Sequence, residues 1–451
     1  MKQKITLSIL LLLSCHIALA QVPPALQQKL QDTLNYMKTT DHYKGLSVSV
    51  GYKSLGIWKS AVGESAPGVN LSTDDLIGIG SNTKTFISAM MLKLVESGQV
   101  HLTDTIGTWM NGYPFVNGQI TIRQVLNHTS GIASYTNNVD FWDSVNVDLN
   151  RLWTKPEIFT KFVTAPTFTA GSSWEYSNTN YLIAGYIEEQ ILGQPIHQIL
   201  RDSIINPLSL THTFFPPYET ATFPYAQVYT DLGLGYTFWM FPYNLNTTAD
   251  AAGALVSNAE DNTKFWQALM KGQIIKKSTL KDSMLNWVTL SSTFGYGLGI
   301  MKAKYFGNTV FSHGGTWIGQ LNSNLADTTR DIYITVLSNQ DSLDNSRTEE
   351  VVAALYKVVL DYVPTAVVDI HSNSSLAVYP NPANDLVYIK HQSAIHSISV
   401  SDMSGKLIYQ EKILSPSKQV QLNVKNYTNG VYLLHCNDDK MGSGSTFIVQ
   451  H

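Results

Sequence analysis

The chain has 451 residues, too many for one ordinary hydrophobic core, so we expect at least two domains. Its 30 basic and 34 acidic residues give a formal net charge of -4, which offers no electrostatic footprint for nucleic acid or an anionic membrane. After the N-terminus no run approaches the ~18 apolar residues that span a bilayer, so we expect no transmembrane segment in the mature chain.

Residues 1–20 are typical of a secretory signal peptide. A basic start, MKQK, precedes the apolar run ITLSILLLL and a small-residue cleavage site at positions 18–20. The mature chain would then begin near Gln21. A weaker alternative is lipidation at Cys15. Removal of the signal leaves Cys436 without a partner for an intramolecular disulfide.

The next 340 or so residues predict an α+β domain. A helix is expected at its start, followed by two strands, an apolar helix, a middle part of short helices and loops, three late strands and a closing helix. Strands from both ends of this domain would form one antiparallel sheet, and the middle would form a helical lobe. The expected helices and strands are residues 23–38, 46–52, 57–62, 76–100, 296–301, 309–313, 331–339 and 348–363.

Beyond this domain, the composition of residues 363–375 is typical of a linker. Seven short alternating strands at regular spacing then predict a small β-sandwich over residues 376–451. The histidines of this tail lack the spacing of metal ligands.

Aromatic residues crowd between positions 214 and 243. They either pack over the core, which is the more common use of aromatic side chains, or form an apolar wall beside a substrate cleft.

Ser81 and Lys84 stand three residues apart where the apolar helix begins, so both side chains lie on one helix face. Burial would lower the pKa of the lysine and let it act as a base toward the serine hydroxyl. Ser-x-x-Lys also occurs at Ser278 and Ser415, but in polar surroundings that would leave the lysine solvated. Taken alone, the pair favours a helix cap beside a solvent-exposed lysine, as most serines and lysines are used.

Two further motifs complete a candidate site. Tyr176 and Asn178 form Tyr-x-Asn at the start of a helix. A tyrosine beside a protonated lysine loses its proton more easily, and an asparagine amide can hold a substrate carbonyl. His313-Gly314-Gly315-Thr316 follows a late strand. Its glycines would let an acyl group approach the backbone, and the Thr316 N–H could join that of Ser81 in an oxyanion hole.

In their order and spacing, SNTK, YSN and HGG resemble the motifs of the penicillin-recognising serine hydrolases. LNHTSGI, AAGALVSNAED and YGLGIM support the likeness, so residues 25–362 are identified as similar to the superfamily of class C β-lactamases and D-Ala-D-Ala carboxypeptidases, which includes esterases and D-aminopeptidases. The resemblance implies a Ser81 acyl-enzyme, proton transfer shared by Lys84 and Tyr176, and substrate binding by Asn178 and residues 313–316. It implies neither a metal nor a cofactor.

One departure concerns the substrate. The β-lactamases of this group usually carry Lys-Thr-Gly where this chain has His313-Gly314-Gly315, so a fixed cation and a hydroxyl that grip a substrate carboxylate are missing. Ester or peptide hydrolysis therefore becomes comparable to β-lactam hydrolysis or D-Ala carboxypeptidase action as an expectation. The alternative from another class is a catalytically silent surface-binding or adhesin protein that keeps the fold.

The tail sequences YPNP, GK and NGVY resemble the C-terminal sorting domain of type IX secretion. This implies the secretion machinery as a partner and an extracellular or cell-surface location, or the periplasm if the tail is not a sorting signal. The alternative is a carbohydrate-binding or adhesive sandwich.

Overall fold

The computed structural model describes residues 21–53, 55–231, 236–341, 347–362, 376–402, 406–437 and 442–451. The chain divides into two compact units between Asp361 and Tyr362. The predicted signal peptide and linker lie outside the described residues. Within those residues, no helix has the length and apolar character that crossing a membrane requires.

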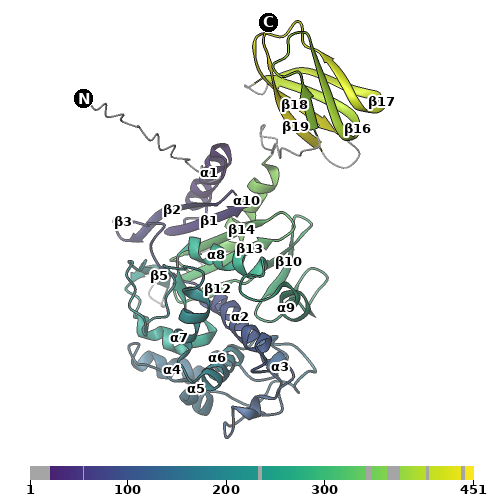
Figure 1. Cartoon of the computed structure of the whole chain (residues 1–451). Helices are drawn as coiled ribbons and strands as arrows, with labels where there is room; N and C mark the ends of the chain where they lie inside the picture. Colours follow the sequence, from purple (N-terminus) through teal and green to yellow (C-terminus); the bar gives the residue numbers. More distant parts are fainter. Residues whose placement is uncertain are drawn as a thin grey trace, which may run out of the picture. The chain divides into compact units, whose positions relative to one another are not determined.

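The first unit is built on a ten-stranded antiparallel sheet (Figure 1). Its order is β3-β2-β1-β14-β13-β11-β10-β9-β8, with β12 paired to β13, so strands from both ends of the domain meet between β1 and β14 as predicted. The strands are β1 (Gly45–Tyr52), β2 (Ile57–Ala66), β3 (Val69–Asn70), β8 (Val288–Thr289), β9 (Gly295–Tyr296), β10 (Met301–Tyr305), β11 (Asn308–Ser312), β12 (Gly315–Trp317), β13 (Gln320–Asp327) and β14 (Ile332–Ser338).

Two features of this sheet differ from the prediction. The strand expected over residues 296–301 is interrupted, because Gly299 has a φ of 67° and turns the chain between β9 and β10. Strand β13 was not predicted at all, since QLNSNLAD has no apolar alternation. Its polar side chains are nevertheless buried, and Ser323 pairs with Thr348 of the last helix at 2.6 Å.

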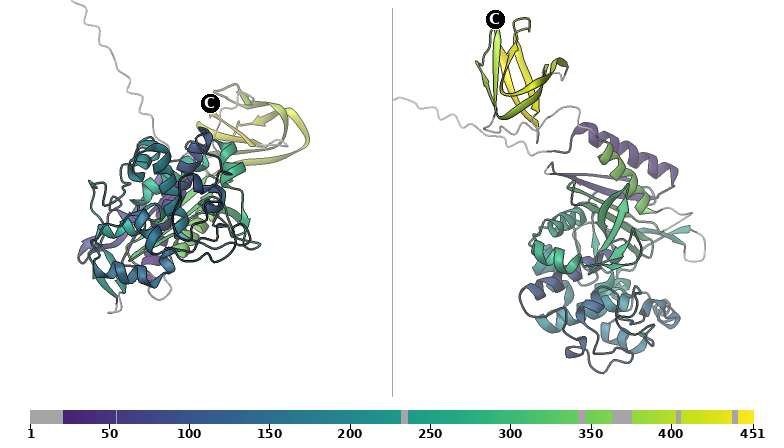
Figure 2. Two further views of the ribbon diagram at one scale, coloured as in Figure 1. Left: turned by 90° about the horizontal axis from the view of Figure 1, so that it is seen from below. Right: turned by 90° about the vertical axis from the view of Figure 1, so that its right-hand side faces the viewer.

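Three helices cover the sheet (Figures 1 and 2). Helices α1 (Pro24–Thr40) and α10 (Thr348–Asp361) pack together on one face, and α8 (Ala259–Met270) lies on the other. Alternation along β1 directs Ser49 to α8, where its hydroxyl meets the Ala259 carbonyl at 2.6 Å.

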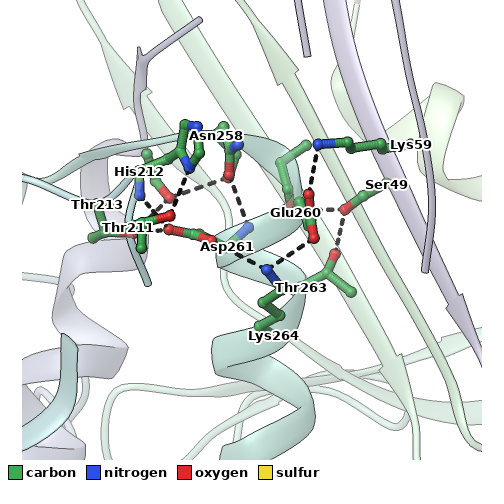
Figure 3. Close-up of polar contacts among 12 residues, drawn as sticks. Ser49, Lys59, Thr211, His212, Thr213, Asn258, Glu260, Asp261, Thr263 and Lys264 are labelled. Atoms are coloured by element: carbon green, nitrogen blue, oxygen red, sulfur yellow. Dashed lines mark hydrogen bonds and ion pairs between the residues drawn. The ribbon is translucent and has the colours of Figure 1, made fainter. Parts of the chain in front are cut away.

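The start of α8 is tied to its surroundings by polar contacts (Figure 3). Asn258 caps the helix by accepting from the Asp261 N–H, and the buried Asp261 carboxylate accepts the His212 N–H at 2.6 Å. Glu260 forms an ion pair with Lys59 of β2 at 2.7 Å. Helix α8 therefore links strand β2 of the sheet to the segment around His212, which follows the helices of the helical lobe in the sequence.

The helical lobe occupies the middle of the sequence, as predicted. Around the buried helix α2 (Thr83–Glu96), it contains α3 (Ile122–Leu126), α4 (Val139–Val147), α5 (Lys155–Lys161), α6 (Asn178–Leu192) and α7 (Ile196–Leu200). The unit also contains α9 (Lys277–Thr279), the short strands β4 (Ile77–Gly78), β5 (Val228–Asp231), β6 (Tyr236–Trp239) and β7 (Val256–Ser257), and the 3-10 or π turns η1 (Gly80–Asn82), η2 (Ile106–Thr108), η3 (Tyr135–Asn137), η4 (Arg201–Ile205), η5 (Tyr243–Thr248), η6 (Asp250–Ala252) and η7 (Leu280–Met284).

The aromatic segment favours core packing over a cleft wall. Phe215 and Phe241 are buried in the main core, and Phe214 is buried in a smaller cluster against which Phe223 and Tyr225 pack. The side chains of residues 236–239 lie outside the described ones.

In the second unit, the seven expected strands merge into five: β15 (Leu376–Tyr379), β16 (Leu386–Asp402), β17 (Leu407–Asn423), β18 (Gly430–Asn437) and β19 (Gly442–Val449). The β16–β17 register shifts between Lys390 and Ile395. Before this irregularity β16 pairs with β15, and after it with β18. Both halves contribute to one core that includes Ile389 and Val400, and buries the free Cys436, so the strand-rich unit has two layers.

Candidate active site

Ser81 lies in η1, directly before α2, and is partly exposed. The preceding β4 pairs with β7, and the Ile79 N–H donates to the Leu255 carbonyl at 2.9 Å. Gly80 has a φ of 49°, and a side chain there would come within 2.9 Å of the Thr316 backbone nitrogen. The turn before the serine therefore packs closely against β12, and glycine is needed for both conformation and space.

Lys84 is fully buried in the first turn of α2. Its Nζ lies 3.0 Å from Ser81 Oγ and 2.6 Å from the Ala252 carbonyl oxygen. Among the described residues no carboxylate pairs with it, and burial lowers its pKa well below the ordinary value of 10.5. Burial therefore favours the neutral form of this amine, the form that can take a proton from the serine hydroxyl.

The Ala252 carbonyl is held by a strained turn that ends in η6. Asp250 has a φ of 40°, and its carboxylate pairs with the buried Lys155 at 2.9 Å. Nearby, the Tyr135 hydroxyl donates to the Thr248 carbonyl at 2.6 Å. These contacts from the helical lobe fix the position of the Ala252 carbonyl, which is the second partner of Lys84.

Tyr176 lies over the lysine, with its ring centroid 5.0 Å from Lys84 Nζ. We expected the lysine to ease ionisation of this phenol, but its pKa is raised. Burial is the main cause, and a side-chain hydrogen bond to Ser81 only partly opposes it. Tyr176 is therefore a neutral hydroxyl that can donate a proton.

Asn178 begins α6 and lines the same cavity as Ser81. Its Nδ2 donates to Thr136 Oγ1 at 3.0 Å, and its backbone N–H donates to Ser134 Oγ at 3.0 Å. The side chain is thus fixed at the cavity wall by η3.

His313 is buried, and both of its ring nitrogens have partners within the protein. Nδ1 lies 2.7 Å from the Gly314 carbonyl, which can only accept, so Nδ1 carries the proton and Nε2 accepts from the Tyr296 hydroxyl at 2.9 Å. Burial, and secondly Lys84, lowers the pKa of His313 to about 3. The imidazole is neutral and offers no cation to a substrate.

Gly314, Gly315 and Thr316 carry the chain from His313 into β12. A side chain at Gly315 would overlap the Ile79 carbonyl oxygen and come within 2.9 Å of the Ser81 backbone nitrogen. The Ser81 and Thr316 N–H groups therefore belong to one tight junction, where two donors could face a developing oxyanion. All eight predicted site residues except Lys84, which lies beneath Ser81, line a cavity of about 600 Å³.

Sequence reasoning assigned no role to His128, although LNHTSGI contains it. His128 is buried with a φ of 64°, and its Nδ1 accepts from the Ser177 N–H at 3.2 Å. Its ring centroid lies 4.4 Å from that of Tyr176 and 4.8 Å from that of Tyr296. It supports the Tyr-x-Asn segment from behind, and no local pattern marks such a contact.

The competing Ser-x-x-Lys copies have the environment that was predicted. Ser278 and Lys281 are exposed, and so are Ser415 and Lys418. Burial of the lysine therefore separates Ser81 from its copies.

Two parts of the chain match known protein families. Residues 30–357 match the beta-lactamase family, and residues 377–450 match the secretion system C-terminal sorting domain. The tail is therefore a sorting domain of the type IX kind. A putative penicillin-binding protein of Bacillus subtilis is 27% identical over 229 residues, 50% of this chain and 54% of that protein. A putative D-alanyl-D-alanine carboxypeptidase of Escherichia coli is 26% identical over 249 residues, 48% of this chain and 56% of that protein.

Among solved structures, a D-stereospecific amidohydrolase from Streptomyces sp. has a TM-score of 0.65 and 29% identity, covering 74% of this chain and 98% of that one. A D-amino acid amidase from Ochrobactrum anthropi has a TM-score of 0.66 and 25% identity, covering 74% and 99%. The chain spans about half the length of the curated relatives it matches. Since the family match extends over most of the sequence, this chain belongs to the beta-lactamase family.

Proposed function

We propose that the first unit is a serine hydrolase that forms an acyl-enzyme on Ser81 with a small ester, amide or peptidoglycan-like peptide. The observation that carries this proposal is the fully buried Lys84, which has no carboxylate partner among the described residues and lies 3.0 Å from Ser81 Oγ. A structural lysine would be expected in an ion pair or in solvent.

In the proposed reaction, Ser81 Oγ attacks the carbonyl carbon and its proton passes to the neutral Lys84 amine. The Ser81 and Thr316 N–H groups stabilise the oxyanion. When the intermediate collapses, the leaving alcohol or amine takes a proton from the Tyr176 hydroxyl. Lys84 then passes the proton that it took from Ser81 to Tyr176. Water repeats the sequence on the acyl ester, which releases the acid and restores the Ser81 hydroxyl.

Incubation with a fluorophosphonate or a fluorescent penicillin, followed by peptide mass spectrometry, tests this assignment. We expect an adduct on Ser81 that is absent from Ser81→Ala and retained in Ser278→Ala, the exposed copy of the motif. Absence of an adduct with every probe would instead favour the catalytically silent binding protein.

Turnover of short-chain p-nitrophenyl esters, nitrocefin and D-amino-acid peptides would rank the substrate classes. The D-stereospecific amidohydrolase and the D-amino acid amidase support including D-amino-acid amides in this set.

We also propose that the tail delivers the enzyme to the cell surface or the medium through the type IX machinery, after a signal peptide at residues 1–20 has directed it across the inner membrane. The match of residues 377–450 to a sorting domain supports delivery by the tail. A chain ending after Tyr362 should accumulate in the periplasm of a type IX-competent host. Its appearance in the medium at the level of the full chain would contradict this proposal.

A further inference from the structure

The Ser81 cavity has an uneven charge. Its lining includes the carboxylate of Glu349, from the first turn of α10, and no Lys or Arg among the described residues. His313 is neutral, and Lys84 is buried beneath the serine. A substrate in this cavity therefore meets one acidic side chain, Glu349, and no exposed basic side chain among the described residues.

The two lysines of strand β10 do not line the cavity. Met301, Ala303 and Tyr305 line it, so alternation places Lys302 and Lys304 on the opposite face of the strand. Lys302 accordingly lies over the Trp287 ring, 5.6 Å from its centroid.

Glu349 approaches Gly314 of the His313-Gly314-Gly315 motif. Its Oε1 lies 3.8 Å from the position that a side chain at Gly314 would take. Among the described residues no cation forms an ion pair with Glu349. Where the β-lactamases place a threonine hydroxyl, this chain has an open position with a carboxylate beside it.

We propose that the Ser81 cavity selects substrates that carry a protonated amine, which Glu349 receives beside Gly314, over substrates that carry a carboxylate. This inference rests on the proposed function and names the substrate class of the same site. An adjoining hollow of about 570 Å³ shares Glu349 and contains Arg347, so a longer substrate would meet a cation only beyond the carboxylate.

Protection of Ser81 from fluorophosphonate labelling tests the preference without requiring turnover. The competitors are D-alanine amide and its N-acetyl and N-succinyl derivatives, which present an amine, no charge and a carboxylate. Near pH 7 the amine is mostly protonated. We expect D-alanine amide to protect at about tenfold lower concentration than the acetyl derivative, and the succinyl derivative to be weakest.

Glu349→Gln should remove the advantage of the amine and leave the acetyl derivative unchanged. Glu350→Gln is the matched control, because this neighbouring carboxylate does not line the Ser81 cavity. Equal effects of the two substitutions, equal protection by the three competitors or protection by none would overturn the inference. So would a preference for the succinyl derivative that Arg347→Gln abolishes. If Ser81 is labelled in these cases, the proposed function survives; if no variant is labelled, both fail.

Discussion

On the helical side of the Ser81 cavity, the reacting groups are held by burial. Lys84 has two neutral partners, and Tyr176 is held among aromatic rings. On the sheet side, Gly314 and strand β12 present backbone groups, and the acidic side chain comes from the exposed Glu349 of α10. Chemistry on the first side depends on desolvation, which any nearby change would disturb. Recognition on the second depends on one rim charge, which can change without repacking a core.

The largest expected effect is on the helical side. Lys84→Met keeps the length and fills the buried site, but removes the amine beside Ser81. We expect kcat to fall about 10³-fold, since general base catalysis is typically worth 10² to 10⁴. Steady-state kinetics on the best substrate checks this, with thermal unfolding as the control. A folded variant with near-parental kcat would remove Lys84 from the mechanism.

At the junction of the two sides, Gly315→Ala should lower kcat about 100-fold, because a methyl group there overlaps the Ile79 carbonyl and displaces the Ser81 turn. Gly314→Ala is the matched comparison. Its methyl group would lie 3.4 Å from the nearest neighbour, so the Ser81 turn should stay in place, and we expect a change in KM rather than kcat because the methyl group fills the position beside Glu349. A comparable loss of kcat in the two variants would show that β12 does not set the position of Ser81.

The neutral His313 predicts a pH dependence of stability. Its pKa is lowered from 6.5 to about 3 when the protein folds, by burial first and by Lys84 second. The unfolded chain therefore binds a proton in this window that the folded protein does not, so stability is present above pH 6.5 and is lost as pH falls toward 3.

Urea denaturation along this pH range should show a smaller loss of unfolding free energy on acidification in His313→Asn than in the parent. His128, whose pKa is also lowered by burial, remains in both proteins. Identical pH slopes would mean that the His313 imidazole is not buried in its neutral form.

The smallest effect on activity is expected away from the cavity. Asp261→Ala leaves the His212 N–H without its acceptor at the start of α8 and should cost about 1–3 kcal/mol of unfolding free energy with little change in kcat. Glu260→Gln, which weakens only partly exposed ion pairs, should cost less than about 1 kcal/mol. A greater loss of unfolding free energy in Glu260→Gln than in Asp261→Ala would show that Glu260, and not Asp261, anchors the start of α8.

Local sequence patterns were sufficient for the elements that follow them. The buried α2, the outer helices and the edge-to-centre strands β1, β2 and β14 were predicted, because apolar residues recur along them with the period of the element. Strand β13 could not be found this way. Its interior side chains are polar, and one of them, Asn324, accepts the His313 N–H at 3.1 Å. The partner of Asn324 lies more than ten residues earlier in the sequence, so the sequence around Asn324 does not indicate this contact.

The candidate site shows the same division. Ser81, Lys84 and Tyr176 were named from motifs, and the polar surroundings of the other Ser-x-x-Lys copies predicted that their lysines are solvated, as the structure has them. The raised pKa of Tyr176 was not foreseen, because it results from rings that pack around it in the fold. Glu349 is a surface residue of a helix far along the chain, and its approach to Gly314 follows from tertiary packing alone.

The most direct test of the central claim is the rate of Ser81 acylation by a fluorophosphonate as a function of pH. If a buried, neutral Lys84 activates the serine, the rate should reach its plateau well below 10.5, the ordinary pKa of lysine. A rate that keeps rising through 10.5 would show that the amine is protonated at neutral pH and would contradict the account.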